Sequence, residues 1–353
     1  MTINNKALAE LQKNYADVLF QGYVPELSRL STGLPIVDYI LGGGLPIGRI
    51  TQCYGESSAG KTLFALTCIK YAQEQGLDCA IVDMEKTIDA NRLQNLGIDV
   101  SKLIFVRPDT GDDALAITEE LCKAGVDLIV LDSIAACMPR VMMETEADEF
   151  ANKAFIANQA AMFARWMSRL QTNLSKANSV LLALNQTRTK IATYPTPVSL
   201  PGGKAVAFYT SIILKISTKY SDKADGVGES LYVTTKNKTA INGRKADVRI
   251  TATGIDRNHA EMQVLVNPEF GIFRTNGAMY HLTTDILESG CINDYIQDEN
   301  PNTTAYARGK QNCIDKLNEN PLLKEACLQF IRSKTIIVES AAVPINELDI
   351  IEE

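Results

Sequence analysis

The stretch YGESSAGKT at 54–62 directly follows the apolar run RITQC and precedes a helix-like segment, KTLFALTCIKYAQEQG. Gly55, Gly60, Lys61 and Thr62 fill every fixed position of the pattern G-x-x-x-x-G-K-[ST]. Glycines there let backbone N–H groups turn toward phosphate oxygens, and the helix N-terminus adds the positive end of its dipole. We therefore predict a nucleotide-binding loop between a strand and a helix. The remaining loop residues expected to contact the nucleotide are Glu56, Ser57, Ser58 and Ala59.

Apolar runs and helical stretches alternate along the first half of the chain. The runs are RITQCY, CAIVDME, LIFVRP, VDLIVLDS and SVLLALNQ. Nearly all-apolar runs belong to strands buried on both faces, so this alternation predicts an α/β core with a mostly parallel twisted sheet and crossover helices. After residue 205 the runs SIILKIS, ESLYVTTKNK, ADVRITATG and MQVLVN predict antiparallel strands at the sheet edge. Beyond about 282 we expect helices again, one of them starting at Pro321.

These patterns divide the chain into four parts. Residues 1–30 hold an amphipathic helix over 5–20 and a linker, and this helix packs on its own core or on a partner's surface. Residues 31–268 form the core, and 269–335 form a small C-terminal α/β domain. Residues 336–353 read as an acidic tail that competes with polyanions for basic surfaces.

Composition excludes several classes of protein. The longest strongly apolar stretch, LIVLDSIAACM, is interrupted by Asp132 and is too short to cross a membrane. The eight cysteines form no C-x-x-C pair and the two histidines are isolated, which indicates reduced thiols in a cytoplasm rather than disulfides or zinc. The net charge is −7, yet residues 151–250 carry 15 basic against 4 acidic side chains. This basic middle either binds a polyanion or only solvates one surface.

Polar side chains end three of the predicted strands. Asp132 ends VDLIVLDS, beside the loop, where it and Thr62 could hold Mg²⁺. Glu85 ends CAIVDME and could orient and deprotonate an attacking water, although an acid that only starts a helix is the alternative. Asn185 and Gln186 end SVLLALNQ, and an amide there could sense the γ-phosphate. Lys61 would neutralise the β- and γ-phosphates, and the need for a water favours hydrolysis over transfer to a metabolite.

The segment TRTKIATYPTPVSLPGG at 187–203 has two basic residues, three prolines and no acidic residue. It is long for a plain connection. Arg188 and Lys190 suit phosphates, while Ile191 and Tyr194 could wedge between or stack on bases. We expect a DNA-binding loop, with a lid over a small substrate as the alternative.

The order of these motifs resembles the bacterial RecA-type recombinases. The motifs are GESSAGKT, VDMEKTID, PDTGDDALAI, VDLIVLDSIAACMP, LNQTRTKI, PGGKAVAFY and KNK. They run from about Leu30 to Lys238, and the match continues more loosely to Arg332. The resemblance implies ATP and Mg²⁺ as ligands and DNA-stimulated ATP hydrolysis. It also implies a helical homo-oligomer on single-stranded DNA that pairs with homologous double-stranded DNA.

The resemblance also implies roles for individual residues. Glu85 would be the water-activating base and Gln186 the γ-phosphate sensor. Segments around 140–152 and 187–204 would be the two DNA loops. The residues expected at DNA in the second loop are Arg188, Lys190, Ile191, Gly202 and Gly203. Lys236 and Lys238 would reach the ATP of the neighbouring subunit, and the N-terminal helix would pack on an adjacent protomer.

Several positions depart from the family pattern. Asp89 and Arg92 stand at the base side of the nucleotide, where Arg92 replaces a common tyrosine and Ala252 a second one. Ala207 replaces a common interface lysine, residues 255–268 look like an insertion, and the first DNA loop is acidic. The departures indicate a divergent member that works in the cytoplasm of a bacterium or of a phage-infected cell. A ring helicase and a weakly hydrolysing regulatory paralogue stay as alternatives.

Overall fold

The computed structural model describes residues 10–11, 13–14, 26–143, 152–187, 200–222, 227–292 and 305–341. Most of the expected N-terminal helix lies outside these residues, as does the acidic tail after 341. Within the described residues, no helix has the length and apolar character needed to cross a bilayer.

The described part of the core is built on a nine-stranded sheet, in the order β11-β10-β9-β8-β3-β7-β6-β4-β5. Pairing is parallel from β5 to β8 and antiparallel from β8 to β11. The predicted mostly parallel sheet with an antiparallel edge is thus confirmed. The strands are β3 (Ile50–Gly55), β4 (Cys79–Asp83), β5 (Leu103–Val106), β6 (Leu128–Asp132), β7 (Val180–Gln186), β8 (Ile212–Asp222), β9 (Val227–Asn237), β10 (Lys245–Thr251) and β11 (Gly254–Ile255).

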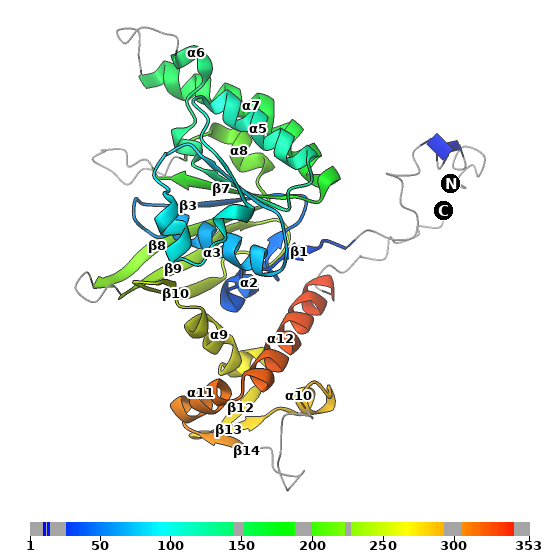
Figure 1. Cartoon of the computed structure of the whole chain (residues 1–353). Coiled ribbons are helices and arrows are strands. Elements are labelled where there is room, and N and C mark those ends of the chain that lie inside the picture. Colours follow the sequence, from blue (N-terminus) through cyan, green and yellow to red (C-terminus); the bar gives the residue numbers. More distant parts are fainter. Residues whose placement is uncertain are drawn as a thin grey trace, which may run out of the picture.

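Helices cover both faces of this sheet (Figure 1). Successive strand residues alternate between two apolar clusters: Leu128 and Val130 face one, while Ile129 and Leu131 face the other. This alternation explains why the strands read as continuous apolar runs. On the first face lie α2 (Pro35–Leu41), α3 (Lys61–Glu74) and α4 (Ala90–Asn95). On the second face lie α5 (Gly111–Lys123), α7 (Asn152–Ala177) and α8 (Gly203–Tyr209).

Short elements complete the described core. Strands β1 (Arg29–Leu30) and β2 (Leu45–Pro46) pair with each other ahead of β3. A 3-10 turn, η2 (Ile134–Ala136), and the short helix α6 (Arg140–Met143) follow β6. The turn η2 follows the end of β6, and α6 forms the start of the first predicted DNA loop, around 140–152.

The strand predicted at 262–267 is wrong, because α9 (Arg257–Leu265) occupies most of this segment. Asp256 caps the helix by accepting a 2.9 Å hydrogen bond from the backbone N–H of His259. Ala260 and Val264, four residues apart, are buried on one face of the helix. The helix contacts α2 and α12, so tertiary packing overrides the β propensity of the valines.

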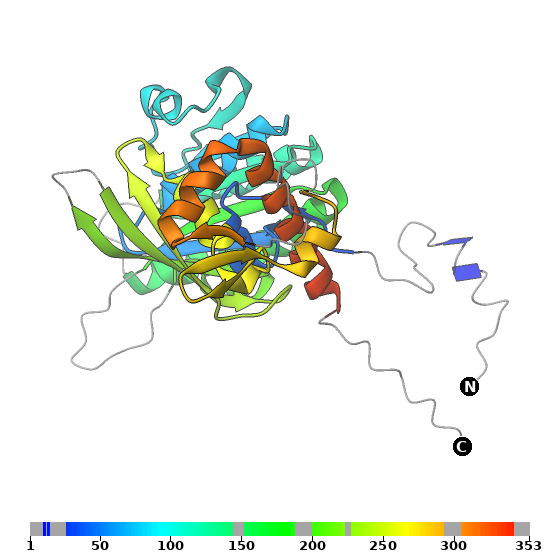
Figure 2. The same cartoon turned by 90° about the horizontal axis from the view of Figure 1, so that it is seen from below.

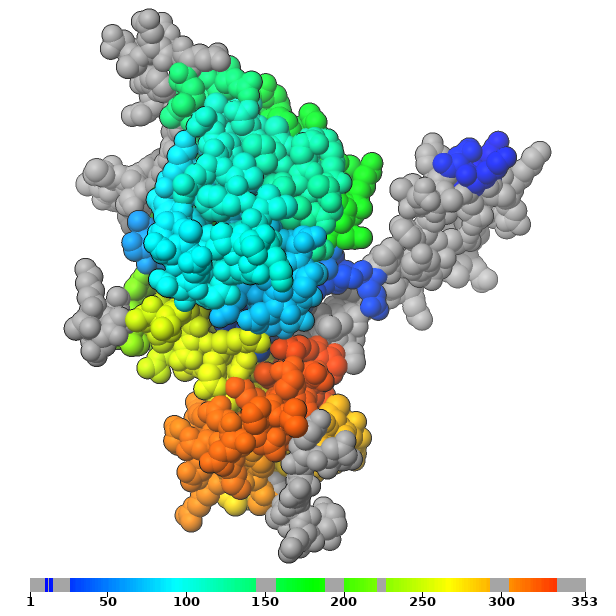
Figure 3. Space-filling view, viewed as in Figure 1, coloured from blue at the N-terminus to red at the C-terminus, as the bar shows by residue number. Residues whose placement is uncertain are grey.

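The C-terminal residues form a lobe below the core (Figure 3), with α9 at the junction. This lobe has an antiparallel sheet of β12 (Phe273–Asn276), β13 (Met279–Leu282) and β14 (Ala305–Arg308). Its helices are α10 (Thr284–Glu288), α11 (Lys310–Glu319) and α12 (Pro321–Ala341). A helix starts at Pro321 as predicted, and β14 adds a strand to the part of this domain after residue 282, where helices were expected. Figure 2 views the molecule from this side, with the lobe toward the reader.

Candidate functional site

The backbone requires glycine at two positions of the loop between β3 and α3. A Cβ atom on Gly55 would lie 2.0 Å from the carbonyl oxygen of Ile216 on the neighbouring strand. Gly60 has φ +96° and is the N-cap residue of α3, a conformation that L side chains rarely adopt. The sequence pattern is therefore required by the close approach of two backbones and by the turn into α3.

Lys61 places its ammonium group inside the loop. Its Nζ donates hydrogen bonds to the carbonyl oxygens of Glu56 (2.6 Å) and Gly55 (3.2 Å). The residue is only 8% exposed, and burial lowers the pKa of the Lys61 ammonium. A nearby phosphate would offset that effect, because an opposite charge favours the charged form. The site is thus electrostatically suited to an anion.

Thr62 and Asp132 meet at the edge of the sheet. Thr62 Oγ1 donates a 2.9 Å hydrogen bond to Oδ2 of Asp132, whose side chain is almost fully buried. The pKa of Asp132 is raised to about 6, and burial is the main cause. The hydrogen bond from Thr62 and the charge of Lys61 lower this pKa, while the charges of Glu85 and Asp83 contribute to raising it.

The residues present fit Mg²⁺ rather than a softer metal. The hydroxyl of Thr62 and the carboxylate of Asp132 are the hard oxygen ligands that Mg²⁺ prefers, and phosphates and waters commonly complete its shell. Among the described residues, no three His, Cys, Asp or Glu side chains gather into a metal cage. A bound Mg²⁺ would neutralise charge on the phosphates that it contacts.

Glu85 lies next to Asp132 at the same edge of the sheet. Its Oε1 accepts a 2.6 Å hydrogen bond from Nε2 of Gln186 and another 2.6 Å bond from Oγ of Ser133. The backbone N–H of Glu85 donates to the carbonyl oxygen of Asp132, which fixes the end of β4 to the end of β6. The structure thus brings Glu85 and Gln186 together, as their positions at strand ends suggested. Sequence reasoning assigned no role to Ser133, although it directly follows Asp132.

The base side of the predicted nucleotide site is exposed. Asp89 is the N-cap residue of α4, and its Oδ1 accepts a 2.9 Å hydrogen bond from the backbone N–H of Arg92. Both side chains are exposed. One carboxylate oxygen of Asp89 is therefore used to start α4, and the guanidinium of Arg92 extends from its first turn.

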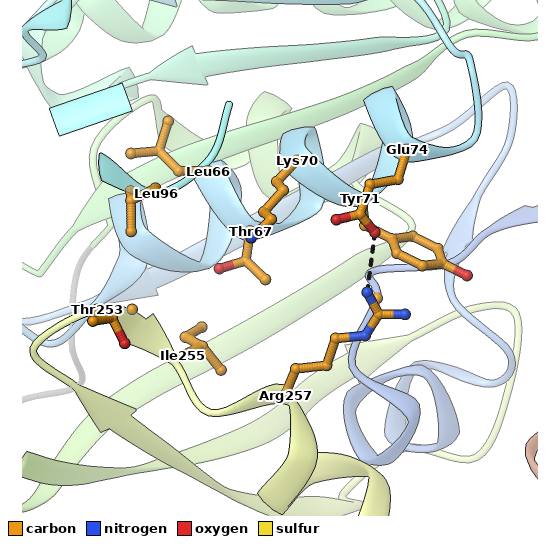
Figure 4. A pocket seen from close by; sticks show the side chains of 11 residues that line it. Leu66, Thr67, Lys70, Tyr71, Glu74, Leu96, Thr253, Ile255 and Arg257 are labelled. Atoms are coloured by element: carbon orange, nitrogen blue, oxygen red, sulfur yellow. Dashed lines mark hydrogen bonds and ion pairs between the residues drawn. The ribbon is translucent and has the colours of Figure 1, made fainter. Parts of the chain in front are cut away.

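A cavity of about 80 Å³ lies farther along α3 (Figure 4). Its walls come from α3, from Leu96 and from the turn between β10 and β11. An ion pair of 3.0 Å between Arg257 and Glu74 lies at one side, and the Arg257 guanidinium stacks 4.9 Å from the ring of Tyr71. None of the loop residues 55–62 lines this cavity, so it is separate from the phosphate loop.

The two predicted DNA loops are described only at their ends. Residues 144–151 lie outside the described residues, as do Arg188, Lys190 and Ile191. Gly202 and Gly203 start α8 with φ +92° and +73°. Asn185 Nδ2 donates a 3.0 Å hydrogen bond to the carbonyl oxygen of Pro201. This bond ties the end of β7, next to Gln186, to the end of the second predicted loop.

Lys236 and Lys238 lie at the other end of α8. Lys236 Nζ donates to the carbonyl oxygens of Ala207 and Thr210, and Lys238 Nζ donates a 2.8 Å bond to that of Phe208. Burial lowers the pKa of Lys236, and the neighbouring charge of Lys238 adds to this effect. In this single chain both ammonium groups therefore contact α8 rather than residues 55–62.

Comparison with known proteins gives a consistent result. The family model described as the RecA N-terminal domain matches residues 3–256. A curated Protein RecA from Mesomycoplasma hyopneumoniae (strain J) is 34% identical over 326 residues, which cover 89% of this chain and 95% of that protein. Protein RecA from Chlorobaculum tepidum is 37% identical over 268 residues, covering 74% and 76%. Protein RecA from Synechocystis sp. is 31% identical over 360 residues, covering 99% and 94%.

Proposed function

Because this chain belongs to the RecA family, it is an ATP-dependent recombinase and DNA-dependent ATPase, and we propose that it acts as a filament on single-stranded DNA. The filament would pair this strand with homologous double-stranded DNA and exchange strands. Family membership does not favour the two alternatives, a ring helicase and a weakly hydrolysing regulator.

The hydrogen bond between Gln186 and Glu85 carries the proposed mechanism. Glu85 is the base that activates water, and Gln186 senses the γ-phosphate. Gln186 ends β7, and the predicted DNA loop starts at the next residue. If Gln186 exchanges Glu85 for the γ-phosphate as its hydrogen-bond partner, the movement of its side chain would therefore shift the first residues of that loop.

The loop would bind the phosphates of ATP, and two side-chain oxygens would bind Mg²⁺. Lys61 and the N–H groups of residues 55–62 contact the phosphates, while Thr62 and Asp132 hold Mg²⁺. Asp89 and Arg92 lie at the base side, where a guanidinium plane can stack on adenine.

DNA contacts come from the second loop. Arg188 and Lys190 bind phosphates, and Ile191 separates bases. Gly202 and Gly203 let the backbone approach the strand, and in the structure both have positive φ angles at the start of α8.

The active site is completed by a second copy of the chain. Lys236 and Lys238 leave the carbonyl oxygens of α8 and contact the ATP of the neighbour. Two adjacent ammonium groups repel each other, so a phosphate between them is favourable. Residues 1–30 pack on the adjacent protomer.

The division into domains and the cellular compartment complete the proposal. Residues 31–268 form the ATPase core and 269–335 the C-terminal domain, which the separate sheet of β12, β13 and β14 supports. Seven of the eight cysteines are buried and one, Cys291, is exposed; we propose that they stay reduced in a cytoplasm.

The first experiment measures ATP hydrolysis with and without single-stranded DNA. We expect strong stimulation in the native chain. Lys61→Ala should lose both nucleotide binding and turnover. Glu85→Gln should still bind ATP and DNA but lose about a hundredfold or more in turnover. Full turnover of Glu85→Gln would exclude Glu85 as the base, and DNA-independent turnover of the native chain would exclude the filament mechanism.

A further inference from the structure

Ser133 is fully buried at the end of β6 and donates its hydroxyl proton to Glu85. The distance between Ser133 Oγ and Glu85 Oε1 is 2.6 Å. A hydroxyl bonded to a carboxylate at this distance makes a charge-assisted hydrogen bond, about twice as strong as a neutral one. The contact joins residues far apart in the chain, which follow the ends of the neighbouring strands β4 and β6.

The backbone of Ser133 is held in place on both sides. The carbonyl oxygen of Asp132 accepts hydrogen bonds from the N–H groups of Met84 (2.6 Å) and Glu85 (3.2 Å). The carbonyl oxygen of Ser133 accepts a 3.0 Å bond from the N–H of Ala136 in η2. Backbone hydrogen bonds between the ends of β4 and β6 thus fix the position of Ser133 relative to Glu85.

Gln186 is a different kind of partner. Its Nε2 also donates to Oε1 of Glu85, but the residue is only half-buried and ends β7. A γ-phosphate sensor must give its amide to the nucleotide, and Glu85 then loses this bond. Both bonds reach Oε1 and neither uses Oε2. The bond from Ser133 therefore keeps Oε2 oriented when Gln186 departs.

We infer that Ser133 is a positioning residue for ATP hydrolysis: its hydroxyl holds Glu85 in the orientation that activates water, independently of Gln186. The inference rests on the proposed role of Glu85 as the base. Ser133 itself touches no reacting atom. Its effect is on the geometry of the proton acceptor, and misplacing such a group lowers the rate of the chemical step rather than substrate binding.

The test compares Ser133→Ala with the native chain at saturating single-stranded DNA. Losing a hydrogen bond to a charged acceptor should lower kcat about tenfold or more, with KM for ATP changed less than about twofold. Ser179→Ala is the matched control, because Ser179 is equally buried and its Oγ has no partner among the described residues. Its kcat should equal that of the native chain.

Thermal unfolding and ATP binding are measured on each variant. If Ser133→Ala does not fold, Ser133→Cys serves instead, since it is close in size and its thiol is only a weak donor. An unchanged kcat in a folded variant that lacks the hydroxyl would overturn the inference. A tenfold rise in KM at constant kcat would also overturn it, because binding rather than positioning would then be affected.

A double variant separates this inference from the proposed base. In the Glu85→Gln background, Ser133→Ala should cause no further loss in single-turnover hydrolysis of ATP, because the group that it positions has been removed. A further tenfold loss would show that Ser133 acts without Glu85. Full turnover of Glu85→Gln alone would instead refute the base, which is a different failure.

Discussion

Thr62 Oγ1 lies 2.9 Å from Oδ2 of Asp132, so a hydroxyl at the start of α3 and a carboxylate at the end of β6 share a hydrogen bond across 70 residues of sequence. Parallel strands place their carboxyl ends at one edge, which explains why this pair forms. In this position the hydroxyl supports the ionised carboxylate against the cost of burial. The same two oxygens can change partner from each other to a metal ion.

Asp132→Asn should abolish Mg²⁺-dependent turnover. The amide oxygen is a weaker ligand than a carboxylate, so we expect ATP hydrolysis to fall about a hundredfold or more. ATP binding should be similar with Mg²⁺ and with a chelator in the variant, whereas the native chain should bind more tightly with Mg²⁺. Titration calorimetry under both conditions measures the difference. Asp109→Asn, at an exposed carboxylate paired with Lys86, is the control and should keep the Mg²⁺ effect. A variant at Asp132 that still gains affinity from Mg²⁺ would contradict the site.

Asp38→Ala should destabilise the chain by about 2–4 kcal/mol. The carboxylate of Asp38 is buried, and it accepts hydrogen bonds from Ser31 Oγ, Thr32 N (2.8 Å) and Thr32 Oγ1 (2.7 Å). Removing it leaves several buried donors without an acceptor. Urea unfolding measures the change in the free energy of unfolding. A loss below about 0.5 kcal/mol would show that water replaces the carboxylate.

Asp38→Asn tests the sign of the electrostatic contribution. Burial raises the pKa of Asp38 above its ordinary value of 3.8, against the hydrogen bonds from Ser31 and Thr32 that lower it. A raised carboxyl pKa means that the folded chain holds its proton more firmly than the unfolded chain. Stability from this group is therefore greatest at low pH and falls as the pH rises above about 3.8. As the pH rises from about 4 through the raised pKa of Asp38, the difference in the free energy of unfolding between the two proteins should shift in favour of the neutral variant. Urea unfolding at several pH values measures this difference, and an opposite trend would contradict the assignment.

Local patterns predicted which side chains meet at the edge of the sheet, because each strand end and the loop are encoded locally. The glycines of the loop and the polar ends of β4, β6 and β7 mark positions that a parallel sheet must bring to one edge. The helix α9 was missed because Val264 and Val266 favour a strand, while the cap at Asp256 and the packing on α2 decide the outcome.

Other features require three dimensions. Helix α7 was not identified, although Met162, Phe163, Met167, Leu170 and Leu174 are buried at helical spacings that its sequence shows. The bond from Ser133 to Glu85 has no counterpart in any sequence pattern, because it depends on how β6 lies beside β4. The contacts of Lys236 and Lys238 with α8 likewise depend on the pairing of β8 with β9.

Gly203→Ala should weaken the coupling of DNA to ATP hydrolysis. A Cβ atom at this position would lie 2.8 Å from Cβ of Ala160 on α7, and the φ of +73° disfavours any L side chain. We expect a loss of about 1–3 kcal/mol in stability from the strained backbone and a shift of the first turn of α8. DNA-stimulated ATP hydrolysis should fall about tenfold or more, a drop equivalent to about 1.4 kcal/mol. Hydrolysis without DNA should change less than about twofold.

Gly243→Ala is the matched control for this variant. Its φ of +84° imposes a similar backbone strain, but no atom lies within 4 Å of the added Cβ. It should lose stability to a similar degree while keeping its stimulation by DNA. Equal loss of stimulation in both variants would show that general destabilisation, rather than the contact between α7 and α8, is responsible. Full stimulation by DNA in Gly203→Ala would exclude Gly203 from the proposed DNA site. An added methyl group would keep the DNA strand away from a backbone that contacts it, so DNA binding through this backbone would not survive the change.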